Sequence, residues 1–267
     1  ERAAANENVN LYDYLKDEVG YRLADRVFDI KRTFEIAVDF GCGRGYISKN
    51  VYDDCIKKLI MCDMSPAMLE QAIGSEGLNI SKQVLQDEYL QFEESSIDLV
   101  LSSMYLHWIN DLPGCFKSIL KCLKPDGVFM AALLGGETLY ELRSSLQLAD
   151  MERRGGISAH ISPFAEARDI GSLLTRAGFV MLTIDTDDII VGYPTMFELI
   201  NDLKGMAENN AAWNRPLHLR RDTLLAASSI YQEMYGKEKG IPATFQIIFL
   251  VGWKPSPDQP QPLPRGS

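Results

Sequence analysis

Between residues 34 and 134 the sequence alternates strand patterns with helix patterns, and this alternation constrains the fold more than any other feature. Strand patterns occur at 34–40, 58–64, 82–87, 96–104 and 128–134. Helix patterns occur between them, at 46–53, after the capping signal Ser65-Pro66, and at 112–123. Regular alternation of this kind predicts a parallel sheet with helices covering both of its faces.

The remainder of the chain is predicted to be mainly helical. Helix patterns occur at 11–30, 138–154, 166–177, 195–209 and 219–236. Two strand patterns, at 181–191 and 243–253, interrupt the late helices. We therefore expect a helical lid over 1–33, an α/β domain over 34–254 with cap helices mainly within 138–236, and a disordered proline-rich tail over 255–267.

Composition narrows the range of partners. The net charge is −10, and no run of lysine and arginine exceeds two residues, so we do not expect the protein to bind nucleic acid. The five cysteines form no Cys-x-x-Cys pair and are expected to be buried, reduced thiols, which favours a reducing compartment. No apolar stretch approaches the roughly 18 residues of a membrane span, so no transmembrane segment is expected.

The loop after the first strand reads Asp39-Phe-Gly41-Cys-Gly43-Arg-Gly45. Loops that bind the pyrophosphate of a dinucleotide instead read Gly-x-Gly-x-x-Gly. Here a carboxylate precedes the glycines, where it would repel a pyrophosphate but attract a cation. S-adenosylmethionine carries an ammonium and a sulfonium and no phosphate, and glycines allow the backbone to approach a ligand closely. The loop is therefore interpreted as a site for S-adenosylmethionine.

Acidic residues at two further strand ends support this interpretation. Asp63 ends the second predicted strand, where a carboxylate can accept hydrogen bonds from ribose hydroxyls. Asp87 ends the third, and Glu88 beside it is placed to accept from an adenine amino group. The alternatives are a nicotinamide site, or a glycine turn among surface acids. The predicted cofactor-binding set is Asp39, Gly41, Cys42, Gly43, Gly45, Asp63, Met64, Asp87, Glu88 and Ser102.

Several long motifs resemble known families. "SSMYLHWINDLPGCFKSILKCLKPDGVFM" is similar to the branch that includes the bacterial methyltransferase of malonyl carrier protein. The segments "DYLKDEVGYRLADRVFDI", "VDFGCGRGYI", "GGETLYELRSSLQLAD", "HISPF", "MFELINDLKGM" and "AWNR" more closely resemble the mitochondrial complex I assembly factors of methyltransferase fold. The resemblance implies a class I S-adenosylmethionine-dependent methyltransferase fold, Rossmann-like, with sheet order 3-2-1-4-5-7-6 and an antiparallel last strand.

The assembly-factor family is described as protein arginine hydroxylases that act on an iron–sulfur core subunit of complex I. The resemblance thus implies arginine hydroxylation, with the iron–sulfur subunit and other assembly factors as partners. It also implies a location in the mitochondrial matrix or peripheral to the inner membrane. Two alternatives stay open. One is a methyltransferase acting on a carboxyl group or a protein side chain, and the other is a non-catalytic scaffold that binds S-adenosylmethionine.

No motif identifies the catalytic residues, and the candidates are His107, Asp111, His160 and Tyr140. After the fourth strand the chain lacks the Asn-Pro-Pro-aromatic loop used in methylation of bases and amides. His107 and Asp111 are four residues apart and would share one face if this segment is helical, and with His160 they have the residue types of a two-histidine, one-carboxylate iron site. Alternatively, His107 is a packing residue and His160 a structural loop residue. Iron is therefore only a candidate cofactor.

An arginine substrate would require carboxylates for its guanidinium and an aromatic ring to stack on it. The predicted contacts are Glu137, Glu141, Asp185, Asp187 and Trp213. Alternatively, the acids form a solvated rim and the tryptophan belongs to the core.

Overall fold

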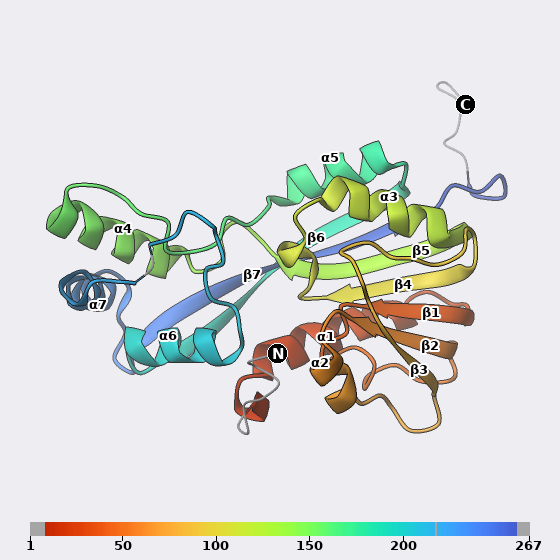
Figure 1. The fold of residues 1–267 in the computed structure, drawn as a ribbon, viewed down its shortest axis with the longest axis horizontal. Helices are drawn as coiled ribbons and strands as arrows, with labels where there is room; N and C mark the ends of the chain where they lie inside the picture. Colours follow the sequence, from red (N-terminus) through yellow and green to blue (C-terminus); the bar gives the residue numbers. More distant parts are fainter. Residues whose placement is uncertain (1–8, 217, 261–267) are drawn as a thin grey trace. The chain divides into compact units, whose positions relative to one another are not determined.

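A computed structural model describes residues 9–216 and 218–260 of the chain (Figure 1). Within these residues the strands form one sheet in the order β3-β2-β1-β4-β5-β7-β6, which confirms the predicted fold class and strand order. The strands are β1(Phe34–Phe40), β2(Ile56–Asp63), β3(Asn79–Val84), β4(Ile97–Ser103), β5(Leu123–Leu134), β6(Val180–Tyr193) and β7(Ile241–Trp253).

The centre of the sheet is parallel and deeply buried. β1 pairs in parallel with β2 on one side and with β4 on the other, so Ala37 lies between Leu59 and Leu99. All three side chains are fully buried. Such burial explains why these strands read as continuous apolar runs and why their positions could be predicted.

The helices agree with the predicted ones to within a few residues at most ends. They are α1(Tyr14–Phe28), α2(Pro66–Gln71), α3(Leu112–Cys122), α4(Tyr140–Arg154), α5(Ala167–Ala177), α6(Met196–Gly205) and α7(Arg221–Tyr235), with short 3-10 helices at Val9–Leu11 and Leu106–Trp108. The Ser65 side chain caps α2 by accepting from Met68 N–H, and Pro66 occupies the first turn, as predicted. Figure 1 shows α3 and α5 side by side along the strands.

Two predicted elements were wrong. The segment 46–53 forms consecutive turns instead of a helix. The glycines before it have positive φ, and the Asn50 side chain donates to the Tyr46 carbonyl, which diverts a helical acceptor. The third strand ends at Val84, so Asp87 lies three residues beyond it rather than at its end. β3 is a mostly exposed edge strand, and its polar sequence gave no apolar pattern to set the boundary.

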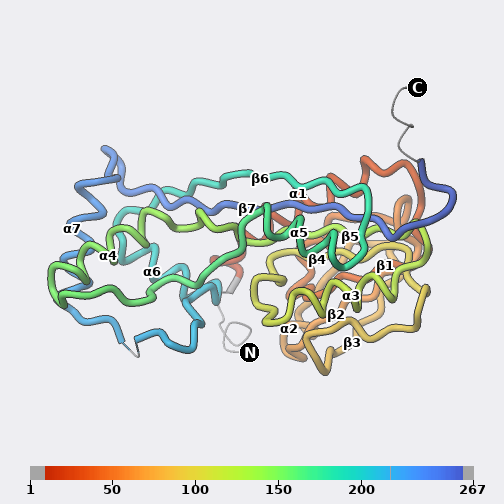
Figure 2. Tube along the Cα trace, turned by 90° about the horizontal axis from the view of Figure 1, so that it is seen from above, coloured from red at the N-terminus to blue at the C-terminus, as the bar shows by residue number. Residues whose placement is uncertain are grey.

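The chain divides into two compact units. The sheet unit comprises residues 16–133, 167–185 and 249–267, and the helical unit comprises 1–15, 134–166 and 186–248. In the helical unit, α4, α6 and α7 lie together (Figure 2). Residues 16–33 of the expected lid belong to the sheet unit. Residues 1–8 of that lid and 261–267 of the expected tail lie outside the described residues.

All five cysteines are buried and free, which confirms the prediction of buried, reduced thiols. In the part of the chain that the structure describes, no helix has both the length and the apolar character needed to cross a membrane.

A buried carboxylate fixes α4 to β7 inside the helical unit. Glu141 is 1% exposed. Its carboxylate accepts the Thr244 backbone N–H at 3.2 Å through Oε2 and the Thr244 hydroxyl at 2.5 Å through Oε1. Burying a charge is costly unless hydrogen bonds compensate it, so these two bonds make the position tolerable.

We expect Thr244→Val to destabilise the protein by about 1.5–3 kcal/mol, because it removes a hydrogen bond to a buried charged group. Thr183→Val, at an exposed position of β6, is the matched control and should change stability by less than about 0.5 kcal/mol. Urea unfolding of both variants measures the difference. Equal stability of the two variants would contradict the role assigned to this bond.

Candidate functional site

Asp39 lies at the end of β1 and is 1% exposed. Its Oδ2 accepts a hydrogen bond from Ser48 Oγ at 2.7 Å, whereas Oδ1 has no hydrogen-bond partner among the described residues. Burial raises the pKa of Asp39 to about 7; the Asp63 charge also raises it, and the Ser48 hydrogen bond opposes the shift. A buried carboxylate oxygen without a hydrogen-bond partner is suited to receive a cation or a hydrogen-bond donor from a ligand.

The loop beyond Asp39 requires glycine for two separate reasons. Gly41 and Gly45 have φ values of +73° and +88°, which side-chain-bearing residues rarely adopt. A Cβ on Gly41 would also lie 2.0 Å from the Tyr105 ring, and one on Gly45 would lie 2.0 Å from the Ile73 carbonyl oxygen. The loop backbone is therefore packed against its neighbours more closely than any larger residue would allow.

Asp63, at the end of β2, holds this loop in place. Its Oδ2 accepts from Gly43 N–H at 2.8 Å and its Oδ1 accepts from Ser65 N–H at 2.8 Å. Each carboxylate oxygen has a second lone pair, so the side chain can still accept from a ligand hydroxyl. β1 and β2 thus bring two carboxylates and the glycine loop to the same edge of the sheet.

The acids that follow the third strand, Asp87 and Glu88, are arranged differently from the prediction. Asp87 is exposed, and its Oδ1 accepts from Glu88 N–H at 2.6 Å. The Glu88 carboxylate accepts from Asn110 N–H at 3.0 Å and from Asn110 Nδ2 at 2.5 Å. Glu88 therefore ties the loop after β3 to the segment before α3, an arrangement that no sequence pattern indicated.

The other predicted cofactor residues are in different environments. Cys42 is 3% exposed, and its N–H donates to the Cys62 carbonyl. Ser102 is fully buried and donates to the Phe40 carbonyl at 2.8 Å, so it links β4 to β1. Met64 is 47% exposed. Of these three, only Met64 presents a large solvent-accessible surface.

His107 and Asp111 do not share a helical face, so that prediction was wrong. His107 lies in the 3-10 helix Leu106–Trp108, with its ring centroid 5.4 Å from that of Trp108. Asp111 is the N-cap of α3 and accepts from Gly114 N–H and from the Tyr89 hydroxyl. The Gly114 N–H, followed by the Tyr89 hydroxyl, lowers the pKa of Asp111.

His160 and Tyr140, the remaining catalytic candidates, belong to the helical unit. Across residues 9–216 and 218–260, no group of three histidine, cysteine, aspartate or glutamate side chains is placed to hold a metal ion. The described residues therefore do not fit the iron site considered from the sequence.

The predicted arginine contacts are also dispersed. Glu137 is exposed just before α4, whereas Glu141 is enclosed and bonded to Thr244, which removes it from the surface where it was expected. Asp185 forms an ion pair with Arg26 at 3.2 Å, and Asp187 is half-buried in β6. Trp213 is 95% exposed, so it does not belong to the core.

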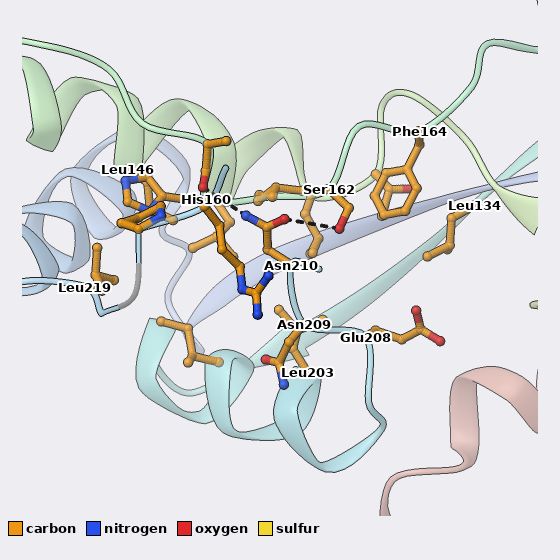
Figure 3. Close-up of a pocket in the computed structure, with 18 of the residues that line it drawn as sticks. Leu134, Leu146, His160, Ser162, Phe164, Leu203, Glu208, Asn209, Asn210 and Leu219 are labelled. Atoms are coloured by element: carbon orange, nitrogen blue, oxygen red, sulfur yellow. Dashed lines mark hydrogen bonds between the residues drawn. The ribbon is translucent and has the colours of Figure 1, made fainter. Parts of the chain in front are cut away.

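The helical unit contains a cavity of about 250 Å³ that the sequence did not predict (Figure 3). We call it the helical-unit pocket. Its lining is mostly apolar, from α4, α6, β7 and the segments around 159–164 and 208–219. Polar groups include His160, Glu208 and Arg215. His160 and Arg215 lie in the "HISPF" and "AWNR" motifs, whereas Glu208 follows a helix without a distinguishing pattern.

Relatives that match nearly the whole chain establish its family, and a domain profile matches part of it. The profile described as "Methyltransferase domain" matches residues 38–131. The chain is 52% identical over 257 residues to "Arginine-hydroxylase NDUFAF5, mitochondrial" of Danio rerio, covering 96% of this chain and 80% of the relative. The Homo sapiens protein of the same name is 53% identical over 267 residues, covering 99% and 77%. The chain belongs to the NDUFAF5 family.

The similarity extends beyond this family. "Malonyl-[acyl-carrier protein] O-methyltransferase" of Methylovorus sp. is 30% identical over 250 residues, covering 90% of this chain and 82% of that protein. Among solved structures, the YcgJ protein of Bacillus subtilis superposes with a TM-score of 0.58 at 14% identity, covering 88% of this chain and 98% of the other. The phosphoethanolamine N-methyltransferase 2 of Haemonchus contortus was solved with S-adenosyl-L-methionine. It superposes with a TM-score of 0.51 at 16% identity, covering 87% of this chain and 53% of the other. These structures share the fold of the NDUFAF5 family.

We expect Gly41→Ala to be far more damaging than Gly77→Ala. Gly77 has a φ of +85° and no atom within 4 Å of an added Cβ, so its substitution costs only the backbone strain of about 1–2 kcal/mol. Gly41→Ala adds the collision with Tyr105. Urea unfolding should rank the two variants clearly, and Tyr105→Ala should partly rescue Gly41→Ala. Equal destabilisation by both glycine substitutions would show that the contact is not tight.

The affinity for S-adenosylmethionine should rise with pH through about 7, because the ionised form of Asp39 attracts the ammonium and the raised pKa leaves it protonated below that value. Titration calorimetry from about pH 6 to about pH 8 measures how the affinity for S-adenosylmethionine changes with pH. Asp39→Asn should bind weakly and without this slope, whereas Asp53→Asn, at an exposed position, should behave as the wild type does. A slope that persists in Asp39→Asn would assign the titration to another group.

Proposed function

We propose that the protein hydroxylates an arginine side chain of an iron–sulfur core subunit of mitochondrial complex I during assembly. The observation that carries this proposal is the 52–53% identity, over nearly the whole chain, to relatives named mitochondrial arginine-hydroxylase. The same names support a mitochondrial location. We further propose the matrix, or the matrix surface of the inner membrane, as the place where the protein meets that subunit and other assembly factors.

The chemistry sets what an assay must contain. Insertion of one oxygen atom from dioxygen into a C–H bond reduces the other oxygen atom to water. That balance consumes two electrons and two protons, so a two-electron donor is a required co-substrate. Co-expression in a respiring cell supplies both dioxygen and reductants.

We assign S-adenosylmethionine to the edge of the sheet where Asp39, Asp63 and the glycine loop lie. Asp39 would attract the ammonium through Oδ1, and Asp63 would accept from the ribose. When bound, S-adenosylmethionine supplies a methyl group activated by a sulfonium. Methyltransferase neighbours solved with this ligand support the choice of cofactor. Glu88, bonded to Asn110, would shape the adenine end rather than reach it freely.

A second candidate function is methyl transfer to a carboxyl group or a protein side chain. The same two aspartates and glycines would serve that reaction. The 30% identity to malonyl-[acyl-carrier protein] O-methyltransferase over 90% of the chain favours this candidate over an unrelated chemistry. A scaffold that binds the cofactor without catalysis is the remaining alternative, and the same experiment distinguishes all three.

We would co-express the iron–sulfur core subunit with the wild-type protein, with Asp63→Ala, and with Asp53→Asn as the matched control. Peptides of the subunit would then be analysed by tandem mass spectrometry. We expect one added oxygen on an arginine with the wild type and Asp53→Asn, and much less with Asp63→Ala, because the loop loses its tether to β2.

Two other outcomes contradict the proposal. An added methyl group in place of oxygen would return the protein to the chemistry usual for its fold. An unmodified subunit that still co-purifies with the protein would identify a scaffold.

A further inference from the structure

The helical-unit pocket has the size and lining of a site for a single long side chain. Its volume of about 250 Å³ is below the roughly 300–1,000 Å³ of pockets for drug-sized ligands. The walls are mainly aliphatic and aromatic, with contributions from Leu142, Leu203, Phe164 and Phe245. An unbranched chain of methylene groups would bury its surface well against such walls.

The wall formed by residues 158–162 is held in position by the loop that carries Asn210 and Ala211. The Asn210 side chain donates to the Ala159 carbonyl at 2.9 Å and accepts from Ser162 Oγ at 3.3 Å (Figure 3). Ser162 Oγ in turn accepts from Ala211 N–H. These bonds fix the two loops that line the pocket, so the cavity is a built feature of the helical unit.

His160 is oriented by a fully buried carboxylate. Asp150 in α4 is 0% exposed, and its Oδ2 lies 2.7 Å from His160 Nε2 and 3.0 Å from Ser158 N–H. Burial acts to raise the pKa of Asp150, but the His160 bond, Ser158 N–H and nearby Arg154 together hold it below its ordinary value. An ionised Asp150 only accepts hydrogen bonds, so Nε2 carries the proton.

This arrangement leaves Nδ1 of His160 as the atom available to a ligand. In neutral histidine with a protonated Nε2, Nδ1 is an acceptor. Nδ1 makes no hydrogen bond to any described residue and is not sealed from solvent, and the side chain lines the pocket. In its neutral form, His160 is placed to accept a hydrogen bond from an N–H group of a ligand through Nδ1.

The two ends of the pocket differ in their polar groups. In Figure 3, His160 and Leu219 lie at one end, whereas Glu208 lies at the other, near Leu134 and Phe164. Glu208 is half-buried and supplies a carboxylate to the lining. The exposed Arg215 side chain donates through Nη1 to the Ala211 and Ala212 carbonyls of its own loop. A cationic group on a ligand is thus attracted to the Glu208 end.

We propose that the helical-unit pocket receives the side chain of the substrate arginine. The guanidinium pairs with the Glu208 carboxylate, the methylene groups pack on the apolar walls, and His160, positioned by Asp150, accepts a main-chain N–H at the opposite end. The choice of arginine rests on the proposed function, and the site itself rests on the contacts above. Neither Glu208 nor the pocket was among the contacts predicted from the sequence.

The test measures binding of Nα-acetyl-L-arginine methylamide to the full-length protein by NMR titration. The corresponding citrulline derivative is the matched probe, since it keeps the shape and removes the charge. We expect the arginine probe to bind at least tenfold more tightly than the citrulline probe. Glu208→Gln should lose at least tenfold in affinity, and the exposed control Glu238→Gln should bind as the wild type does.

Ala159→Leu provides a second variant, because it enlarges a side chain in the pocket wall without removing a charge. It should abolish binding of the arginine probe while the far-ultraviolet circular dichroism stays native. Equal binding of both probes, or wild-type affinity in Glu208→Gln, would overturn the inference. If the probe binds as expected but no oxygen is added to the iron–sulfur subunit, the pocket stands and the proposed hydroxylation fails.

Discussion

The carboxylate of Asp63 is the interaction on which the candidate cofactor site depends. By accepting from both Gly43 N–H and Ser65 N–H, it joins the glycine loop to the start of α2. The loop can stay there only because its glycines tolerate positive φ and close contact with Tyr105 and Ile73. Asp39 is thereby kept buried behind the loop with Oδ1 available for a cation. Electrostatics and backbone geometry together favour S-adenosylmethionine over a pyrophosphate-containing ligand.

The helical unit uses buried carboxylates in another way. Glu141 is bonded to Thr244, and Asp150 is bonded to His160 and Ser158. Both acids lie on α4, which therefore fixes one strand and one loop through hydrogen bonds that replace the lost hydration of each charge. Because the loop that carries His160 is held this way, the adjoining pocket has a defined shape. The proposed arginine site depends on that rigidity as much as on the charge of Glu208.

The sequence was sufficient to predict the features set by strong local patterns. The apolar strands around Ala37 and the Ser65-Pro66 cap gave clear signals, and the family resemblance supplied the order of the last two strands. Features set by tertiary contacts were missed. Glu141 is a buried anchor because Thr244, distant in sequence, donates to its carboxylate. Glu208 carried no pattern, since its role depends on loops brought together by Asn210.

We propose that a chain of methyltransferase fold adds oxygen to an arginine. This proposal is tested most directly by supplying oxygen-18 gas to cells that co-express the protein and the iron–sulfur core subunit. Mass spectrometry would then identify the isotope on the modified residue. We expect one oxygen-18 atom bound to an arginine carbon, taken from dioxygen. An arginine that carries a methyl group, or no modification, in the presence of folded wild-type protein would contradict the proposal.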